Sequence, residues 1–228
     1  MGRRHIITID GPAGAGKSTV ARSLARALGY LYLDSGALYR AVAWQALKQR
    51  LDLQDPQALS AFLKDFKPRI VSDETGFHLF IHGREITQEL RTPEVSREAS
   101  RVAAVPRVRR WVTERLRSLA RNGGVVAEGR DMGSVVFPAA EVKFFLTADL
   151  AVRAARRRQE WQKEQVAVDL QETMTELAAR DRQDETRTAS PLVAPKGAIS
   201  LDTTGLTPEE VVNRCLTVIR GALAGKNS

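Results

Sequence analysis

The chain has 228 residues, 43% of them hydrophobic, which is enough to build one α/β domain with a substantial core. It has no apolar run near 18 residues and no signal-peptide pattern at its start, so we expect a cytoplasmic protein that neither spans a membrane nor is exported. The formal net charge of +8 at pH 7 indicates an anionic partner, either a nucleic acid or a small phosphorylated molecule.

The positions of the arginines, the cysteine and the histidines narrow the kinds of partner and site that we expect. The arginines recur in short clusters rather than in one basic stripe interleaved with aromatic residues, which favours small polyphosphates over nucleic acid. The single cysteine, Cys215, cannot form an internal disulfide and lies in a helical pattern of apolar residues, so we expect it in the core. The three histidines are scattered and lack the spacing of a metal site.

The first predicted elements are a strand over residues 6–9, a glycine-rich loop and a helix over 18–28. The strand is rich in β-branched residues, and apolar residues recur at helical spacing after the loop until Gly29. Between them the sequence matches the phosphate-binding pattern G-x-x-x-x-G-K-[ST]. The pattern arises by chance in roughly one chain in a hundred, but here it lies in the strand-loop-helix context that it requires. The candidate ATP-binding residues of this loop are Gly11, Pro12, Ala13, Gly14, Ala15, Gly16, Lys17, Ser18 and Thr19.

This loop has the chemistry of a cradle for nucleotide phosphates. Its glycines can take positive φ without a Cβ clash, so successive backbone N–H groups can surround a phosphate. The dipole of the following helix adds to the attraction. Lys17 supplies a mobile positive charge for the β- and γ-phosphates, and the Ser18 hydroxyl lies where a Mg²⁺ ligand is needed.

The second predicted strand, residues 30–34, ends in a serine and a glycine ahead of a helix over 37–50. Ser35 then lies at a strand edge, and Arg40, about one helical turn later, can hold a phosphate with its bidentate guanidinium. A serine N-cap followed by a solvated arginine would give the same pattern. The residues alone therefore leave both interpretations open.

The polarity pattern changes after a predicted helix over residues 56–66. Residues 69–72 and 77–81 read as two strands around a glycine turn, which predicts a β-hairpin. Such a hairpin would be an insertion in the surrounding α/β order. We place the inserted subdomain at residues 65–101 of a single domain that spans 1–228.

Charged residues follow another predicted buried strand, at residues 124–127, which comes after a helix over 106–121. Arg130 and Asp131 stand between glycines at the carboxyl end of this strand. Open α/β sheets bind their ligands at that edge, so we interpret the pair as ligand-binding.

The next predicted strand, residues 142–146, leads to a helix that carries Arg153, Arg156 and Arg157. These arginines fit a solvated helix face, but a short arginine-bearing region at 151–167 could also close over phosphates as a lid. Later, Asp169 with Glu172 predicts a helix start. On that helix, Arg180, Asp184 and Arg187 fall on one face, which alone favours a surface row of ion pairs.

A fifth strand is predicted at residues 198–201, and Thr207 with Glu210 predicts the start of the last helix. The alternation of strands and helices predicts an α/β fold with a five-stranded parallel sheet covered by helices on both faces. Because the strand ends carry the glycine loop and the polar motifs, we expect the functional site at the carboxyl edge of the sheet.

Taken together, these motifs resemble those of the bacterial cytidylate kinase family of P-loop nucleoside monophosphate kinases. The resemblance covers residues 5 to about 220 and rests on motifs in the family's order and spacing. Beyond the glycine loop, these are the segments 34–40, 106–109, 129–138 and 180–187. The insertion at 65–101 resembles the extra subdomain of the bacterial type, which binds the monophosphate, and 151–167 corresponds to the short lid.

The resemblance implies an enzyme that transfers the γ-phosphoryl group of ATP to CMP or dCMP with Mg²⁺, and a role for each matching residue. Lys17, Arg40 and Arg130 are the candidate catalytic residues, Arg153 and Arg157 join the glycine loop in binding ATP, and Ser18 is the candidate metal ligand. One departure is Ser18 itself, where many relatives have glycine, which leaves Thr19 as the other candidate for the metal. The candidate substrate-binding residues are Ser35, Arg40, Ser100, Arg109, Arg130, Asp131, Arg180, Asp184 and Arg187.

The chemistry of cytosine agrees with this assignment, because a hydroxyl and a carboxylate can face its amino donor while a guanidinium faces its acceptors. Ser35, Ser100, Arg109 and Asp131 match the positions that contact the base. The alternatives are a related kinase that acts on UMP or AMP, and a non-catalytic P-loop or RNA-binding protein. We expect a monomer that binds ATP and CMP or dCMP, without nucleic acid or membrane partners.

Overall fold

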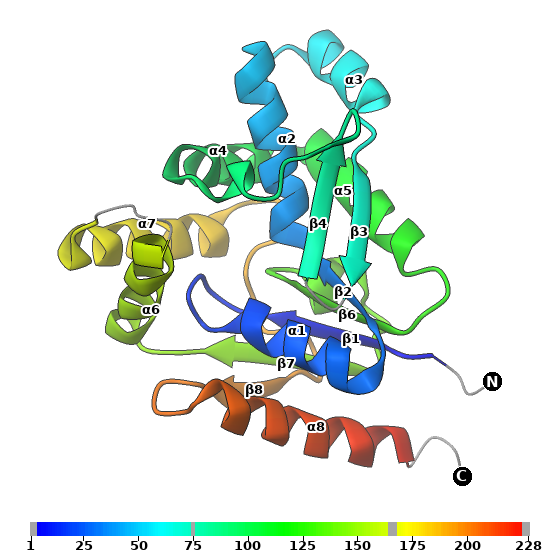
Figure 1. The fold of residues 1–228 in the computed structure, drawn as a ribbon, viewed down its shortest axis with the longest axis vertical. Coiled ribbons are helices and arrows are strands. Elements are labelled where there is room, and N and C mark those ends of the chain that lie inside the picture. Colours follow the sequence, from blue (N-terminus) through cyan, green and yellow to red (C-terminus); the bar gives the residue numbers. More distant parts are fainter. Residues whose placement is uncertain (1–3, 74–75, 164–167, 225–228) are drawn as a thin grey trace. The chain divides into compact units, whose positions relative to one another are not determined.

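The computed structural model describes residues 4–73, 76–163 and 168–224 (Figure 1). The chain divides into two compact units, a first unit of residues 1–30 and 123–228 and a second unit of residues 31–122. Strands β2, β6, β1, β7 and β8 form a five-stranded sheet in that order. The predicted α/β fold with a five-stranded parallel sheet is therefore confirmed.

The first unit contains most of this sheet. β1 pairs in parallel with β6 on one side, where Ile9 lies opposite Glu128, and with β7 on the other; β7 in turn pairs in parallel with β8. Ile7, Ile9 and Phe144 are fully buried, as expected for strands with neighbours on both faces. The strands are β1 (Ile6–Asp10), β6 (Val125–Gly129), β7 (Val142–Thr147) and β8 (Ile199–Asp202).

The helices of the first unit begin and end at residues with clear local causes. Gly29 ends α1 with a φ of 63°, and its N–H donates to carbonyls of the last turn. The predicted N-terminal caps are confirmed, since the Asp169 carboxylate accepts from two backbone N–H groups and Thr207 and Glu210 bond reciprocally. The helices are α1 (Lys17–Leu28), the π-helical turn η2 (Met132–Val136), α6 (Leu150–Lys163), α7 (Leu170–Thr186) and α8 (Pro208–Ala224).

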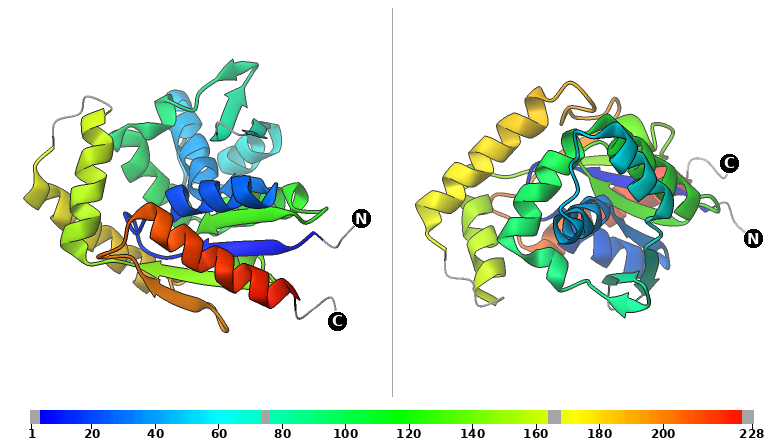
Figure 2. Two further views of the ribbon diagram at one scale, coloured as in Figure 1. Left: turned by 60° about the horizontal axis from the view of Figure 1, so that its bottom comes forward. Right: turned by 90° about the horizontal axis from the view of Figure 1, so that it is seen from above.

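Figure 2 shows α1 and α8 lying side by side over the sheet, while α6 and α7 pack on each other beyond its carboxyl edge. Cys215 on α8 is fully buried, and this burial raises the pKa of its thiol to about 12. The predicted core role of this cysteine is confirmed. Of the predicted lid, residues 151–163 belong to α6, and 164–167 lie outside the described residues.

The second unit begins with β2 (Leu31–Asp34) and α2 (Ser35–Gln49), followed by α3 (Pro56–Asp65). The N-cap of α2 is Asp34, whose Oδ1 accepts from the backbone N–H of Ala37 at 2.9 Å. The alternative in which Ser35 caps this helix is therefore wrong, because Ser35 is already helical and only 3% exposed.

The predicted hairpin is present as part of an antiparallel sheet of β3 (Arg69–Asp73), β4 (Gly76–Ile81) and β5 (Arg84–Glu85). The short helix η1 (Glu89–Arg91) and α4 (Pro93–Ala104) follow, and α5 (Pro106–Leu119) ends the unit. We did not predict α4. Its signals were a Thr-Pro start and buried apolar residues at helical spacing, namely Val95, Ala99 and Val102.

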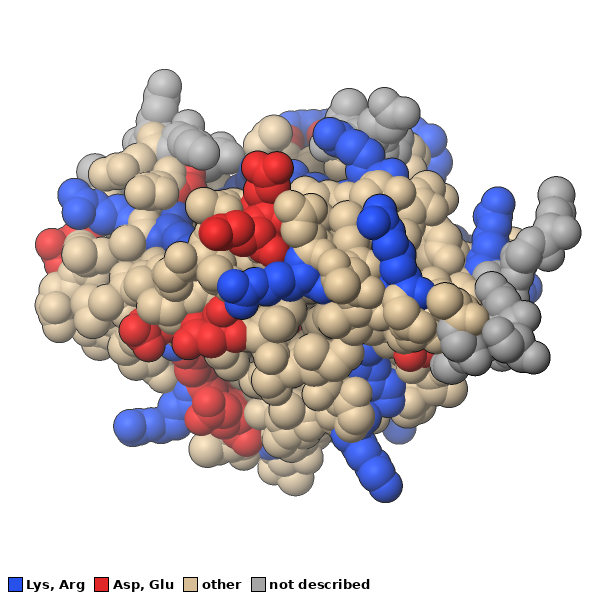
Figure 3. All heavy atoms as spheres, turned by 90° about the horizontal axis from the view of Figure 1, so that it is seen from below, with Lys and Arg blue, Asp and Glu red and all other residues tan. Residues whose placement is uncertain are grey.

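On the face drawn in Figure 3, Lys and Arg side chains are scattered and form no single basic stripe, and most of the Asp and Glu side chains lie in its left and middle part. Among the described residues, no helix is both long and apolar enough to cross a bilayer. The boundaries of the inserted subdomain and of the lid remain predictions.

Candidate active site

The glycine-rich loop connects β1 to α1 at the carboxyl edge of the sheet, and its glycines have the backbone that the sequence predicts. Gly11, Gly14 and Gly16 have φ values of 144°, 76° and 86°. A Cβ added to Gly11 would lie 2.0 Å from the carbonyl oxygen of Leu146, so only glycine fits there. Gly16 is the N-cap of α1, which leaves the first N–H groups of that helix for an anion.

Lys17 begins α1 and is only 6% exposed. Its Nζ donates to the carbonyl of Pro12 within the loop at 2.6 Å. Burial, together with the charges of Arg130 and Arg180, lowers the pKa of Lys17 to about 7, against the opposite effect of Glu128 and Asp10. Positive side chains from three segments are thus close enough to repel one another, which is the electrostatic setting of a site for a polyanion.

Asp10, the last residue of β1, is a buried carboxylate that we did not predict as part of the site. Its oxygens accept hydrogen bonds from the backbone N–H groups of Met132 and Gly133 at 2.8 and 2.7 Å. Burial raises the pKa of Asp10 to about 6, although these two hydrogen bonds act in the other direction. The sequence signal was an acid at the end of an apolar strand, directly before the loop.

Arg130 and Asp131 follow β6 as predicted. The backbone directly after them is held by its two hydrogen bonds to Asp10. The Nε of Arg130 donates to Oδ2 of Asp184 at 2.9 Å, while Asp131 is only 2% exposed. The structure thus places two candidate substrate-binding residues from distant parts of the sequence, Arg130 and Asp184, in contact.

Asp184 also bonds to Arg187, whose Nη1 lies 3.3 Å from Oδ1. Burial alone would raise the pKa of Asp184, but the charges of Arg130, Arg180 and Arg187 hold it below its ordinary value. The side chains of Asp184 and Arg187 are only 11% and 9% exposed, so the interpretation as a surface row is wrong for this pair. α7 ends at Thr186, and Arg187 keeps its contact from the extended backbone that follows the helix.

The arginines of α6 have different surroundings. Arg153 is buried, whereas Arg157 pairs with Glu160 and lies over the ring of Trp161. Arg156 donates to the hydroxyl and carbonyl of Thr203 at 2.9 and 2.7 Å. The two candidate ATP-binding arginines, Arg153 and Arg157, are therefore not equivalent.

Within the second unit, Arg40 and Ser35 come from the start of α2. The Nη2 of Arg40 donates to Oδ2 of Asp34 at 2.9 Å, in a side chain that is 28% exposed. A Cβ at Gly36 would lie 3.0 Å from Nη1 of Arg40 and 3.1 Å from Oδ1 of Asp34, so the glycine leaves room for this ion pair.

The two remaining candidates of the second unit lie near each other in the sequence. Arg109 of α5 is 5% exposed, donates to the carbonyl of Ala103 at 2.9 Å and has its guanidinium 5.6 Å from the centre of the Tyr39 ring. Ser100 lies on α4 and is partly exposed. Tyr39 is a neighbour that the sequence did not single out, although it is part of the motif at 34–40.

Metal ligands are few among the described residues, which contain no group of three or more His, Cys, Asp or Glu able to hold an ion. Ser18 and Thr19 are exposed in the first turn of α1, directly after the glycine-rich loop. A single hydroxyl fits Mg²⁺ that is held chiefly by nucleotide phosphates and water, which is its usual mode in phosphotransferases.

The chain matches the family model described as "Cytidylate kinase" over residues 7–221. It is 47% identical over 219 residues to a cytidylate kinase from Ligilactobacillus salivarius, covering 96% of this chain and 98% of that protein. It is 46% identical to a cytidylate kinase from Carboxydothermus hydrogenoformans, covering 93% and 96% of the two chains. Its fold is similar to that of an uncharacterized protein from Eubacterium ventriosum, with a TM-score of 0.53, 11% identity and coverage of 95% and 99%.

Proposed function

This chain belongs to the cytidylate kinase family, and we propose that it transfers the γ-phosphoryl group of ATP to CMP or dCMP, giving ADP and CDP or dCDP. The observation that carries this proposal is the buried Lys17 at the end of a phosphate cradle, with Arg130 and Arg180 close enough to lower its pKa. Such an arrangement is suited to neutralising charge on phosphates, which is the main demand of phosphoryl transfer.

On the donor side, the backbone N–H groups of the loop would bind the phosphates of ATP. Lys17 would release its hydrogen bond to the carbonyl of Pro12 and donate to the β- and γ-phosphates instead. The negative charge of ATP would raise the pKa of Lys17 and so keep the side chain protonated. Arg157 is the candidate of α6 with the more exposed side chain, and it would add a second positive charge. Ser18 is the preferred residue to hold Mg²⁺, which when bound would offset the negative charge of the phosphates.

On the acceptor side, Arg40 and Arg130 would hold the phosphate of CMP, and the attacking oxygen would be already anionic. A protein base is therefore not required, and the residues act by position and charge. Arg180, Asp184 and Arg187 would surround the ribose and phosphate. The network of Asp184 with Arg130 and Arg187 supports this proposal, because it preorganises two guanidinium groups in a buried setting.

Recognition of the base is assigned to Ser35, Ser100, Arg109 and Asp131. The burial of Ser35, Arg109 and Asp131 at 3%, 5% and 2% exposure supports fixed donors and acceptors rather than mobile surface groups. Hydroxyl and carboxylate oxygens accept from the amino group of cytosine, whereas uracil presents a carbonyl there. A site built in this way rejects a base that leaves its buried polar groups unpaired.

A panel of nucleoside monophosphates tests the proposal, with ATP as donor and production of ADP followed in a coupled assay. We expect the highest kcat/KM for CMP and dCMP, and a preference for AMP or UMP would overturn the assignment of the acceptor. We further propose that the protein acts as a cytoplasmic monomer without a nucleic-acid partner. Sedimentation, and titration with oligonucleotides at low salt, test those two points.

A further inference from the structure

Arg153 connects three segments of the first unit through one buried guanidinium. Its Nε donates to the carbonyl of Ala148, ahead of α6, at 2.9 Å. Its Nη1 donates both to the carbonyl of Ala13 in the glycine loop, at 3.1 Å, and to Oδ2 of Asp181 on α7, at 2.5 Å. Because Arg153 is 7% exposed, these contacts replace solvent around its charge.

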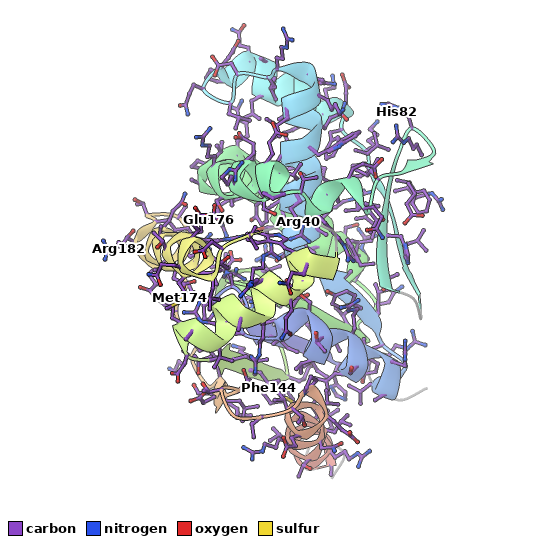
Figure 4. All side chains as sticks on the ribbon, turned by 60° about the vertical axis from the view of Figure 1, so that its left-hand side comes forward. Arg40, His82, Phe144, Met174, Glu176 and Arg182 are labelled. Carbon is purple, nitrogen blue, oxygen red and sulfur yellow. The ribbon has the colours of Figure 1, made fainter. Side chains whose placement is uncertain are left out.

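The glycine loop also packs directly on the backbone of α6 at this point. A Cβ added to Gly14 would lie 2.8 Å from the carbonyl oxygen of Arg153 and 2.9 Å from its Cβ. Ala13 of the loop, Ala154 of α6 and Leu177 of α7 also form one buried apolar cluster. Met174 of α7, which is labelled in Figure 4, packs against this cluster. The loop, α6 and α7 are thus joined by both polar and apolar contacts.

Asp181 is a buried acidic residue where the loop, α6 and α7 meet. It is 9% exposed, and while Oδ2 binds Arg153, its buried Oδ1 has no hydrogen-bond partner among the described residues. A pair of apolar side chains would fill such a position at lower cost, because a buried carboxylate loses its hydration. The Asp181 carboxylate instead fixes the orientation of the Arg153 guanidinium, which also donates to the carbonyl of Ala13 in the loop.

We propose that Asp181 is a positioning residue for ATP, which acts through Arg153 to hold the glycine loop in its phosphate-binding shape. This inference rests on the proposed function of that loop. Asp181 itself touches no phosphate. Without its charge, the guanidinium is free to turn away from Ala13, and the N–H groups of the loop lose their fixed directions. The loss therefore falls on the donor nucleotide and leaves the acceptor unaffected.

The test compares Asp181→Asn with Glu185→Gln, the same change of carboxylate to amide at an exposed position of α7. We expect Asp181→Asn to weaken the binding of ADP, measured by calorimetry, and to raise KM for ATP, each at least fivefold. KM for CMP and the dissociation constant of CMP should stay within twofold of wild type. Glu185→Gln should change none of these values.

Arg153→Lys is a second variant that keeps a positive charge next to Asp181 and so protects the fold. Lysine lacks the planar fork that spans the carbonyl of Ala13 and the carboxylate, so the same selective loss of ADP affinity is expected. Asp181→Asn or Arg153→Lys with normal ADP binding would overturn the proposal, and so would equal losses for ADP and CMP. Binding of ADP needs no acceptor, so this result stands apart from the monophosphate panel.

Discussion

Asp181 and Asp184 lie three residues apart on α7, and both are buried, yet they bind different arginines. Asp181 pairs with Arg153 of α6, which also holds the glycine loop. Asp184 pairs with Arg130 after β6 and with Arg187 after α7, all of them candidate substrate-binding residues. The last turns of one helix thus carry one carboxylate that binds the arginine in contact with the proposed donor loop and another that binds the arginines of the proposed acceptor site.

These two charge pairs are similarly buried, yet their arginines have different effects on the residues around them. Arg130 lowers the pKa of Lys17, so its charge acts directly on the proposed phosphate site. Arg153 is not among the charges with the largest effects on the pKa of Lys17, and its contacts are with backbone and with Asp181. We therefore expect loss of Arg153 to reduce mainly the stability of the fold and the affinity for ATP. Loss of Arg130 should reduce mainly the rate of phosphoryl transfer.

The largest effect on stability is expected for Arg153→Met. The change leaves Asp181 buried without its partner, and breaking a buried ion pair in this way costs about 3 to 5 kcal/mol of unfolding free energy. Urea denaturation monitored by circular dichroism measures the loss. Arg130→Met should be milder, because Asp184 keeps Arg187 as a partner.

A double variant sharpens this prediction. Replacing both partners, as Arg153→Met with Asp181→Leu, removes the unpaired charge and should recover most of the lost stability. Its affinity for ADP should remain low, because the tie to Ala13 is still missing. Recovery of both stability and affinity would show that the pair has only a structural role.

The largest effect on turnover is expected for Arg130→Met. Loss of one charged donor to the phosphates should lower kcat by a factor on the order of 10² to 10³, roughly 3 to 4 kcal/mol in the barrier. Lys17→Ala should fall in the same range. Single-turnover kinetics with saturating ATP and CMP measure the change, and a loss below tenfold for either variant would contradict its role in catalysis.

The residues proposed to bind ATP were largely predictable from the sequence. The glycine loop, Lys17 and the strand before them form a local pattern, in which each residue type follows from backbone geometry and the charge of phosphate. The five strands were also found, because apolar runs bounded by turns identify buried strands well. Helix α4 was missed since its three buried residues are separated by charged ones.

The pairing of charges could not be predicted in the same way. The sequence shows Arg153 and Asp181 as two charged residues 28 positions apart, and nothing local indicates that they meet. The spacing at 180–187 even favoured a solvated surface row, because helical periodicity does not reveal which face the fold covers. Asp10 was not predicted as a site residue for the same reason, because its partners Met132 and Gly133 lie 122 and 123 positions away.

The comparison also predicts a difference in proton uptake. Because burial lowers the pKa of Lys17 to about 7, this lysine is mostly neutral at pH 8 in the free protein. Phosphates favour its charged form, so binding of ADP with Mg²⁺ at pH 8 should take up close to one proton. Calorimetry in buffers of different ionisation enthalpy measures this number, and uptake should disappear in Lys17→Arg, whose guanidinium is always protonated.

The two arginines should separate in this experiment. Arg130 lowers the pKa of Lys17, so in Arg130→Met the lysine is already more protonated at pH 8 and the uptake should fall. In Arg153→Lys the affinity for ADP drops, but the number of protons per bound ADP should stay as in wild type. Equal uptake in wild type and Arg130→Met would contradict the placement of Arg130 beside Lys17.

The smallest effect is expected at the other end of α7, for Asp169→Ala. The backbone N–H groups of Glu172 and Gln171 hold the pKa of this exposed cap below its ordinary value of 3.8. Its stabilising effect is therefore present above about pH 4 and is lost as the pH falls through the lowered pKa. We expect a small decrease in the thermal midpoint at pH 7 that vanishes in strong acid, and no change in KM for ATP. If loosening this end of α7 raised KM for ATP as much as Asp181→Asn does, general fraying of the helix would explain both results.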